Sequence, residues 1–162
     1  MVTVIGLGFV GLTTALGFAQ YGHKVYGIEA NPERMKIIKG GKLPFFEPGL
    51  DEALTRHLGK HFFPTENLED AVADSKYIFY CVGTPYGENE EVDLTDLYGA
   101  LEQTLAVIHD DEFRVLVGRL MVSKTCRSAV CHMKTGTARC RPSMEQQQLR
   151  SEEHTSDSRS RI

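Results

Sequence analysis

The 162-residue chain has no tryptophan, and none of its apolar runs approaches the roughly 20 residues needed to cross a bilayer. It has only four cysteines, and no secretory signal precedes them, so we expect no disulfide framework. The spacing of Cys126, Cys131, His132 and Cys140 matches no common zinc pattern, so we predict no metal site. Met1 leads directly into apolar residues without a basic segment, which is typical of a cytoplasmic protein that does not enter a membrane.

Phenylalanine and tyrosine are absent after Phe113, and the charge reverses in about the same region. Residues 1–117 contain 9 Lys and Arg against 18 Asp and Glu, whereas residues 118–162 contain 9 against 4. We therefore predict one folded domain over 1–117 and a degraded or non-native tail over 118–162. Residues 143–162 are polar and aperiodic, so we expect them to be disordered. The basic tail lacks interleaved aromatic residues, so we predict no nucleic-acid binding.

The sequence of the tail also suggests how residues 118–162 came to be encoded. Its segment Arg-Ser-Glu-Glu-His-Thr-Ser, residues 150–156, resembles the conceptual translation of a common sequencing-library adapter. A frameshift near residue 118, followed by read-through into adapter sequence, would account for the lost pattern and the reversed charge. The alternative is a genuine basic tail, and the source DNA distinguishes the two.

Strand-like and helix-like segments alternate along residues 1–117. Short apolar or β-branched runs predict strands, and apolar residues at helical spacing predict helices. The predicted strands are 2–5, 24–28, 62–63, 76–82 and 113–117, and the predicted helices are 12–21, 32–39, 50–58, 66–73 and 94–108. This order predicts an α/β fold, a Rossmann-type doubly wound parallel sheet covered on both faces, which we expect to be truncated.

A glycine-rich turn follows the first predicted strand. Gly6, Gly8 and Gly11 form the pattern G-x-G-x-x-G, which in this strand-to-helix context is typical of dinucleotide binding. Gly6 permits the tight turn, Gly8 lets the backbone approach a diphosphate, and Gly11 lets the helix pack closely on the strand. The free amides and the partial positive charge of the helix N-terminus then favour the phosphates.

An acidic residue, Glu29, ends the second predicted strand, 18 residues beyond Gly11. A carboxylate there accepts hydrogen bonds from the ribose hydroxyls and repels a 2′-phosphate, so the sequence favours NAD over NADP. Arg34 instead favours NADP, because an arginine near this acid can accommodate a 2′-phosphate. FAD also binds such motifs and is less favoured here.

Several longer segments resemble the UDP-glucose/GDP-mannose dehydrogenase family over residues 1–117. The glycine turn alone does not separate this family from other Rossmann proteins. The segments Pro-x-x-Glu-Pro-Gly-Leu and Val-Gly-Thr-Pro, in this order and spacing, are much more specific. The matching segments are residues 6–12, 31–34, 44–50, 81–85 and 93–94.

The resemblance implies oxidation of a nucleotide sugar at C6 to the uronic acid, with two NAD molecules reduced. By that resemblance, Phe9 and Val10 lie against the cofactor, Arg34 lies near the adenosine, and Glu29 stands where the family usually has Asp. Thr84 follows a strand at the edge where ligands bind, so its hydroxyl is a candidate cofactor contact. Thr125 is a candidate for the family's cofactor-proximal threonine, although the residues around it depart from the family pattern.

No catalytic residue is predicted. The family's nucleophilic cysteine lies in a later domain, and Cys81, within a predicted buried strand, is expected to be inert. We therefore expect a fragment that binds NAD with little or no turnover, from a homodimeric parent that acts on a nucleotide sugar, most plausibly UDP-glucose. Two alternatives stay open: an NAD-dependent 3-hydroxyacid-type dehydrogenase domain, and a non-catalytic nucleotide-binding module.

Overall fold

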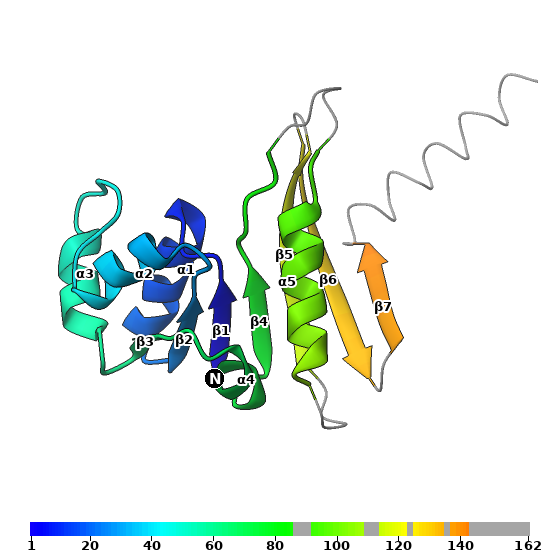
Figure 1. Cartoon of the computed structure of the whole chain (residues 1–162), viewed down its shortest axis with the longest axis horizontal. Coiled ribbons are helices and arrows are strands. Elements are labelled where there is room, and N and C mark those ends of the chain that lie inside the picture. Colours follow the sequence, from blue (N-terminus) through cyan, green and yellow to red (C-terminus); the bar gives the residue numbers. More distant parts are fainter. Residues whose placement is uncertain (86–91, 109–113, 123–124, 135–136, 143–162) are drawn as a thin grey trace, which may run out of the picture.

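The computed structural model describes residues 1–85, 92–108, 114–122, 125–134 and 137–142, the last three segments as backbone only. Helices separate the strands from β1 to β5, and three strands then follow in succession (Figure 1). The strands are β1 (Val2–Ile5), β2 (Val25–Ile28), β3 (Phe62–Pro64), β4 (Tyr77–Tyr80), β5 (Arg114–Val122), β6 (Thr125–Lys134) and β7 (Thr137–Pro142), and the helices are α1 (Phe9–Gln20), α2 (Pro32–Lys39), α3 (Leu50–His57), α4 (Leu68–Ala73) and α5 (Thr95–Ala106).

The strands form one sheet in the order β3-β2-β1-β4-β5-β6-β7. The first five in this order are parallel, with Ile5 of β1 level with Ile28 of β2 and with Tyr80 of β4. The chain moves from β1 outward to β3, then returns to place β4 on the other side of β1. This reversal is the topological switch point of a doubly wound sheet, and it confirms the predicted Rossmann-type fold.

The alternation of side chains along each strand gives the sheet two apolar faces. Val4 of β1 points into a cluster that joins the sheet to α1, α2 and α3. Ile5, the next residue, belongs to a second cluster that joins the sheet to α4 and α5. Since parallel strands are connected by helices that cover both faces, the near-continuous apolar runs of the sequence follow directly from this arrangement.

The helix boundaries follow local capping signals. The Asn31 side chain accepts a hydrogen bond from the Arg34 amide at 3.0 Å, and Pro32 occupies the first helical position of α2. Gly22 follows the end of α1 with a positive φ of 82°. None of the helices in the described segments is long and apolar enough to cross a membrane.

The structure continues as β-strands after residue 117, where the sequence shows no clear helix or strand pattern. The last parallel strand, β5, continues to Val122 instead of ending at residue 117, and β6 and β7 extend the sheet as antiparallel strands. Sequence periodicity gave no signal for them, because this stretch lacks aromatic residues and its apolar residues are sparse. The predicted disorder falls on residues 143–162, which lie outside the described residues.

Candidate functional site

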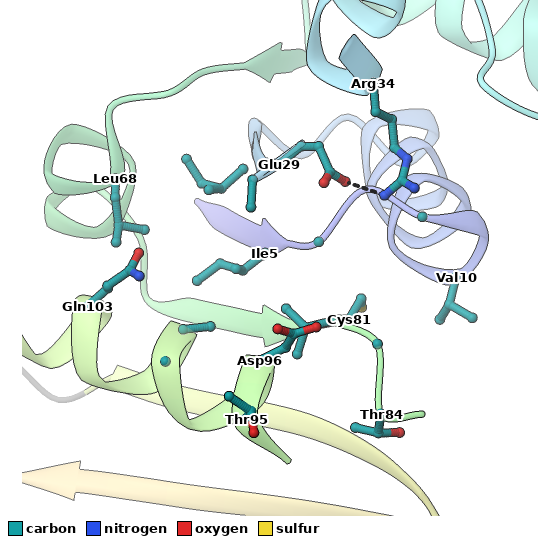
Figure 2. A pocket seen from close by; sticks show the side chains of 18 of the residues that line it. Ile5, Val10, Glu29, Arg34, Leu68, Cys81, Thr84, Thr95, Asp96 and Gln103 are labelled. Atoms are coloured by element: carbon teal, nitrogen blue, oxygen red, sulfur yellow. Dashed lines mark hydrogen bonds and ion pairs between the residues drawn. The ribbon is translucent and has the colours of Figure 1, made fainter. Parts of the chain in front are cut away.

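A cleft with a volume of about 1150 Å³ opens at the carboxyl ends of the parallel strands. Its walls come from the turn after β1, the end of β2, the segment after β4 and one side of α5 (Figure 2). The cleft therefore lies at the switch point, where β1 and β4 separate and where open α/β sheets bind ligands. Its volume lies above the usual range for small-molecule pockets, so it has room for a ligand larger than most such molecules.

The three glycines of the turn differ in whether, and why, the backbone requires glycine at that position. Gly6 has a φ of 89°, in the left-handed region that favours glycine. A Cβ on Gly11 would lie 1.7 Å from the carbonyl oxygen of Gly6, so only glycine allows α1 to begin so close to β1. A Cβ on Gly8 would meet no atom within 4 Å, although Gly8 lines the cleft. The fold itself therefore does not require glycine at Gly8.

The first turn of α1 faces the cleft with free amides. Gly8 caps α1 without a side-chain hydrogen bond, and the amides of Phe9 and Val10 donate no hydrogen bond within the described part of the chain. Phe9 and Val10 line the cleft and are 54% and 41% exposed. The Phe9 ring packs on Phe45 with the ring centroids 5.3 Å apart. The free amides give the start of α1 a geometry that suits an anion, and Phe45 of the Pro-Phe-Phe-Glu-Pro-Gly-Leu segment packs beside it.

The carboxylate of Glu29 reaches this same turn. Its Oε2 accepts a hydrogen bond from the Leu7 amide at 2.8 Å and another from Arg34 Nη1 at 3.1 Å. Its Oε1 accepts from the Asn31 amide at 2.9 Å. The Glu29 side chain is 6% exposed, whereas that of Arg34 is 40% exposed. The two residues therefore form an ion pair at the mouth of the turn, drawn as a dashed line in Figure 2.

The segment after β4 forms the opposite wall. Thr84 is half-buried and lines the cleft near Val10 in Figure 2. The prediction that Cys81 lies within a buried strand was wrong in detail: β4 ends at Tyr80, and Cys81 is half-buried at the edge of the cleft. The amide of Cys81 donates to the carbonyl of Ile5 at 2.7 Å, which holds the segment beside the glycine turn.

One side of α5 completes the cleft, and sequence reasoning assigned no site residue there. The carboxylate of Asp93 accepts a hydrogen bond from the Thr95 amide at 2.9 Å, and hydrogen bonds from Thr95 lower the pKa of Asp93. Thr95 and Gln103 line the cleft, and Gln103 lies across from Leu68 of α4 in Figure 2. No local motif marks these positions, because only the topology brings α4 and α5 to the end of β2.

The structure brings together eight of the nine predicted cofactor residues. Gly6, Gly8, Phe9, Val10, Glu29, Arg34 and Thr84 line the cleft, and Gly11 lies directly behind the turn. The ninth, Thr125, begins β6 opposite Val122, and its side chain lies outside the described residues.

These features define a class of protein. A parallel sheet with a glycine-rich turn at its switch point, free helix amides and a buried acid at the end of β2 is a dinucleotide-binding domain. The residues present fit a dinucleotide: the amides suit the diphosphate, and the cleft continues on both sides of them, towards Leu68 in one direction and towards Thr84 in the other (Figure 2).

Comparison with known proteins narrows this class. Residues 1–145 match the sequence model of the UDP-glucose/GDP-mannose dehydrogenase family, NAD binding domain. The chain belongs to this family, as its NAD-binding domain. The match extends beyond residue 117, the predicted end of the domain.

Individual relatives agree with the family. The chain is 39% identical to a UDP-glucose 6-dehydrogenase of Pseudomonas aeruginosa, over 62% of the chain and 22% of that protein. It is 34% identical to a UDP-N-acetyl-D-mannosamine dehydrogenase of Methanococcus maripaludis, over 71% of the chain and 27% of that protein. A crystal structure of GDP-mannose dehydrogenase from Pseudomonas aeruginosa superposes with a TM-score of 0.69 at 31% identity, covering 73% of this chain and 28% of that one. The chain thus spans about a quarter of the length of these relatives.

Proposed function

We propose that this chain is the cofactor-binding part of a nucleotide-sugar 6-dehydrogenase, whose parent oxidises a UDP- or GDP-sugar at C6 to the uronic acid. The observation that carries the proposal is the cleft at the switch point, where unpaired amides of α1 and the Glu29 carboxylate lie together in a chain of this family. Among the sugars, UDP-glucose is our first choice.

The residues of the cleft would hold NAD along its length. Gly8, Phe9 and Val10 present backbone amides to the diphosphate, at the positive end of the α1 dipole. Glu29 and Arg34 lie where the adenosine ribose would sit, beside the apolar end of the cleft. Thr84 lies on the other side of the turn, where its hydroxyl would donate to the nicotinamide end. Gly6 and Gly11 shape the turn, and Thr125, at the start of β6, is a further candidate contact.

When bound, NAD supplies the hydride acceptor for the reaction. In the parent, oxidation of the C6 alcohol and one water to the carboxylate would reduce two NAD molecules to NADH and release three protons. The described part of this chain can bind and orient the acceptor, but hydride transfer also requires the sugar carbon to be held against it. We therefore propose that the 162-residue chain binds NAD without turnover, and that sugar selection and dimerisation belong to other parts of a homodimeric parent.

Calorimetry with NAD and absorbance measurements of NADH test the proposal together. The purified chain should bind NAD more tightly than NADP, and it should form no NADH with UDP-glucose, GDP-mannose or UDP-N-acetylmannosamine. Turnover with any of these sugars would contradict the proposed lack of activity. Absence of NAD binding by a chain that is folded by circular dichroism would contradict the cofactor assignment.

A further inference from the structure

The carboxylate of Glu29 is surrounded by protein donors. The amides of Leu7 and Asn31 and the guanidinium of Arg34 all donate to it, at 2.8, 2.9 and 3.1 Å. An ionised carboxylate oxygen has about two acceptor positions, so Oε2, which receives both Leu7 and Arg34, has none left. The side chain is also only 6% exposed. A residue that serves solely as a ribose contact does not need this arrangement.

The bond to Leu7 continues the pairing of β1 with β2 beyond the strands. The last backbone bond between them joins the Gly6 amide to the Ile28 carbonyl at 2.8 Å. The next donor along the chain is the Leu7 amide, and its acceptor is the side chain of the next residue after Ile28, Glu29. Leu7 is fully buried, so without Glu29 its amide would lose its acceptor in the described structure.

This bond decides which amides the turn presents. Because the Leu7 amide points to Glu29, it is not available to a phosphate. The donors that remain are those that follow it, at the start of α1, where Phe9 and Val10 line the cleft. The direction of the Leu7 peptide also sets the path of the chain into Gly8.

We propose that Glu29 is a positioning residue for the phosphate-binding turn, acting through the Leu7 amide, in addition to any contact with ribose. This inference rests on the proposed function, because it assumes that a diphosphate binds at the start of α1. It distinguishes Glu29 from a residue that only contacts ribose by one property: an effect of Glu29 on affinity persists when the ribose hydroxyls are removed.

Two ligands test this property, ADP and 2′,3′-dideoxy-ADP, which has the diphosphate but neither hydroxyl. Their dissociation constants are measured by calorimetry for the whole chain and for Glu29→Gln. We expect Glu29→Gln to weaken both ligands, each by roughly tenfold, which corresponds to about 1.4 kcal/mol. Glu33→Gln is the matched control, because Glu33 is an exposed glutamate on α2, and it should change neither constant by more than about twofold.

A variant that loses affinity for ADP alone, with dideoxy-ADP unchanged, would overturn the proposal and leave Glu29 as a ribose contact. Failure of the wild-type chain to bind either ligand would instead contradict the proposed function. A second measurement covers a variant that is too unstable for calorimetry: hydrogen exchange of the Leu7 amide in the wild-type chain and in Glu29→Asp, which is one methylene shorter. The Leu7 amide should be protected in the wild type and exchange at least tenfold faster in Glu29→Asp. Equal exchange rates would refute the role of the hydrogen bond between Glu29 and the Leu7 amide.

Discussion

Gly8 and Gly11 belong to one motif, yet the structure predicts that alanine affects different properties at the two positions: cofactor binding at Gly8 and stability at Gly11. At Gly11 the added Cβ would lie 1.7 Å from the Gly6 carbonyl oxygen and 3.1 Å from the Cys81 side chain. At Gly8 it would meet nothing within 4 Å, and the backbone there has a φ of −69°, which alanine adopts without strain. Gly11→Ala should therefore damage the fold, and Gly8→Ala should damage only the site.

The magnitudes follow from these contacts. Relief of a 1.7 Å approach to a backbone oxygen requires α1 to move away from β1, and overpacking of this severity costs about 3 kcal/mol or more. For a domain of this size that corresponds to a fall in Tm of roughly 10 °C. For Gly8→Ala, the reduced entropy of the unfolded chain stabilises by about 0.4–1 kcal/mol, and the poorer N-cap costs a similar amount, so the stability should change by less than about 1 kcal/mol.

Thermal unfolding by circular dichroism and NAD binding by calorimetry separate the two effects. Gly8→Ala should keep the Tm of the wild type and weaken NAD binding by at least roughly tenfold, because its methyl group enters the cleft where the diphosphate would meet the backbone. Two outcomes would refute the reasoning: a loss of stability in Gly8→Ala as large as in Gly11→Ala, or NAD affinity in Gly8→Ala equal to that of the wild type.

Two buried titratable groups give further predictions. Burial raises the pKa of Tyr80 to about 12, although the nearby Thr104 hydroxyl opposes part of this shift. The neutral phenol therefore stabilises the fold fully below pH 10, the ordinary pKa, and this stabilisation is lost towards pH 12. Urea unfolding at about pH 9 and pH 11 should show that the wild type loses about 1 kcal/mol more than Tyr80→Phe, and equal losses would contradict this. Burial, followed by positive neighbours such as His61, lowers the pKa of His57, whose Nε2 lies 2.9 Å from Gln20 Oε1. The contribution of His57 is therefore complete above pH 6.5 and falls as the pH drops, so acidification should destabilise the wild type more than His57→Gln in urea unfolding, whereas parallel curves would count against it.

Much of the fold could be predicted because each element carries its own signal. The strand Val2–Ile5 is a short apolar run followed by glycine, and α2 begins with an Asn-Pro pair and ends before two glycines. These local signals survive in the structure because tertiary packing agrees with them. The strands β6 and β7 carried no such signal. Each pairs antiparallel with the strand directly before it in the chain, and the origin of residues 118–162 stays a prediction that the source DNA tests.

Residues of the cleft could be predicted only where they belong to a local sequence motif. The glycine turn is such a case, because the spacing of Gly6, Gly8 and Gly11 reflects the sterics of one turn. Thr95 and Gln103 are not, since they reach the cleft only because the chain reverses direction after β3 and returns with α5 beside β4. Residues supplied by topology have no local pattern, and sequence reasoning therefore missed this wall of the cleft.

Glu29 shows a third kind of case, in which the position of the residue at the cleft agrees with the prediction but its contacts were not predicted. Its distance from Gly11 identified it as the acid at the end of β2, yet nothing in that spacing indicates that its carboxylate bonds to Leu7. That bond depends on two things: the parallel register that brings Ile5 level with Ile28, and the side-chain length that lets Glu29 reach Leu7. If the proposed positioning role holds, replacing the glutamate with the shorter aspartate should alter how the turn is held, and would not be a neutral exchange of one acid for another.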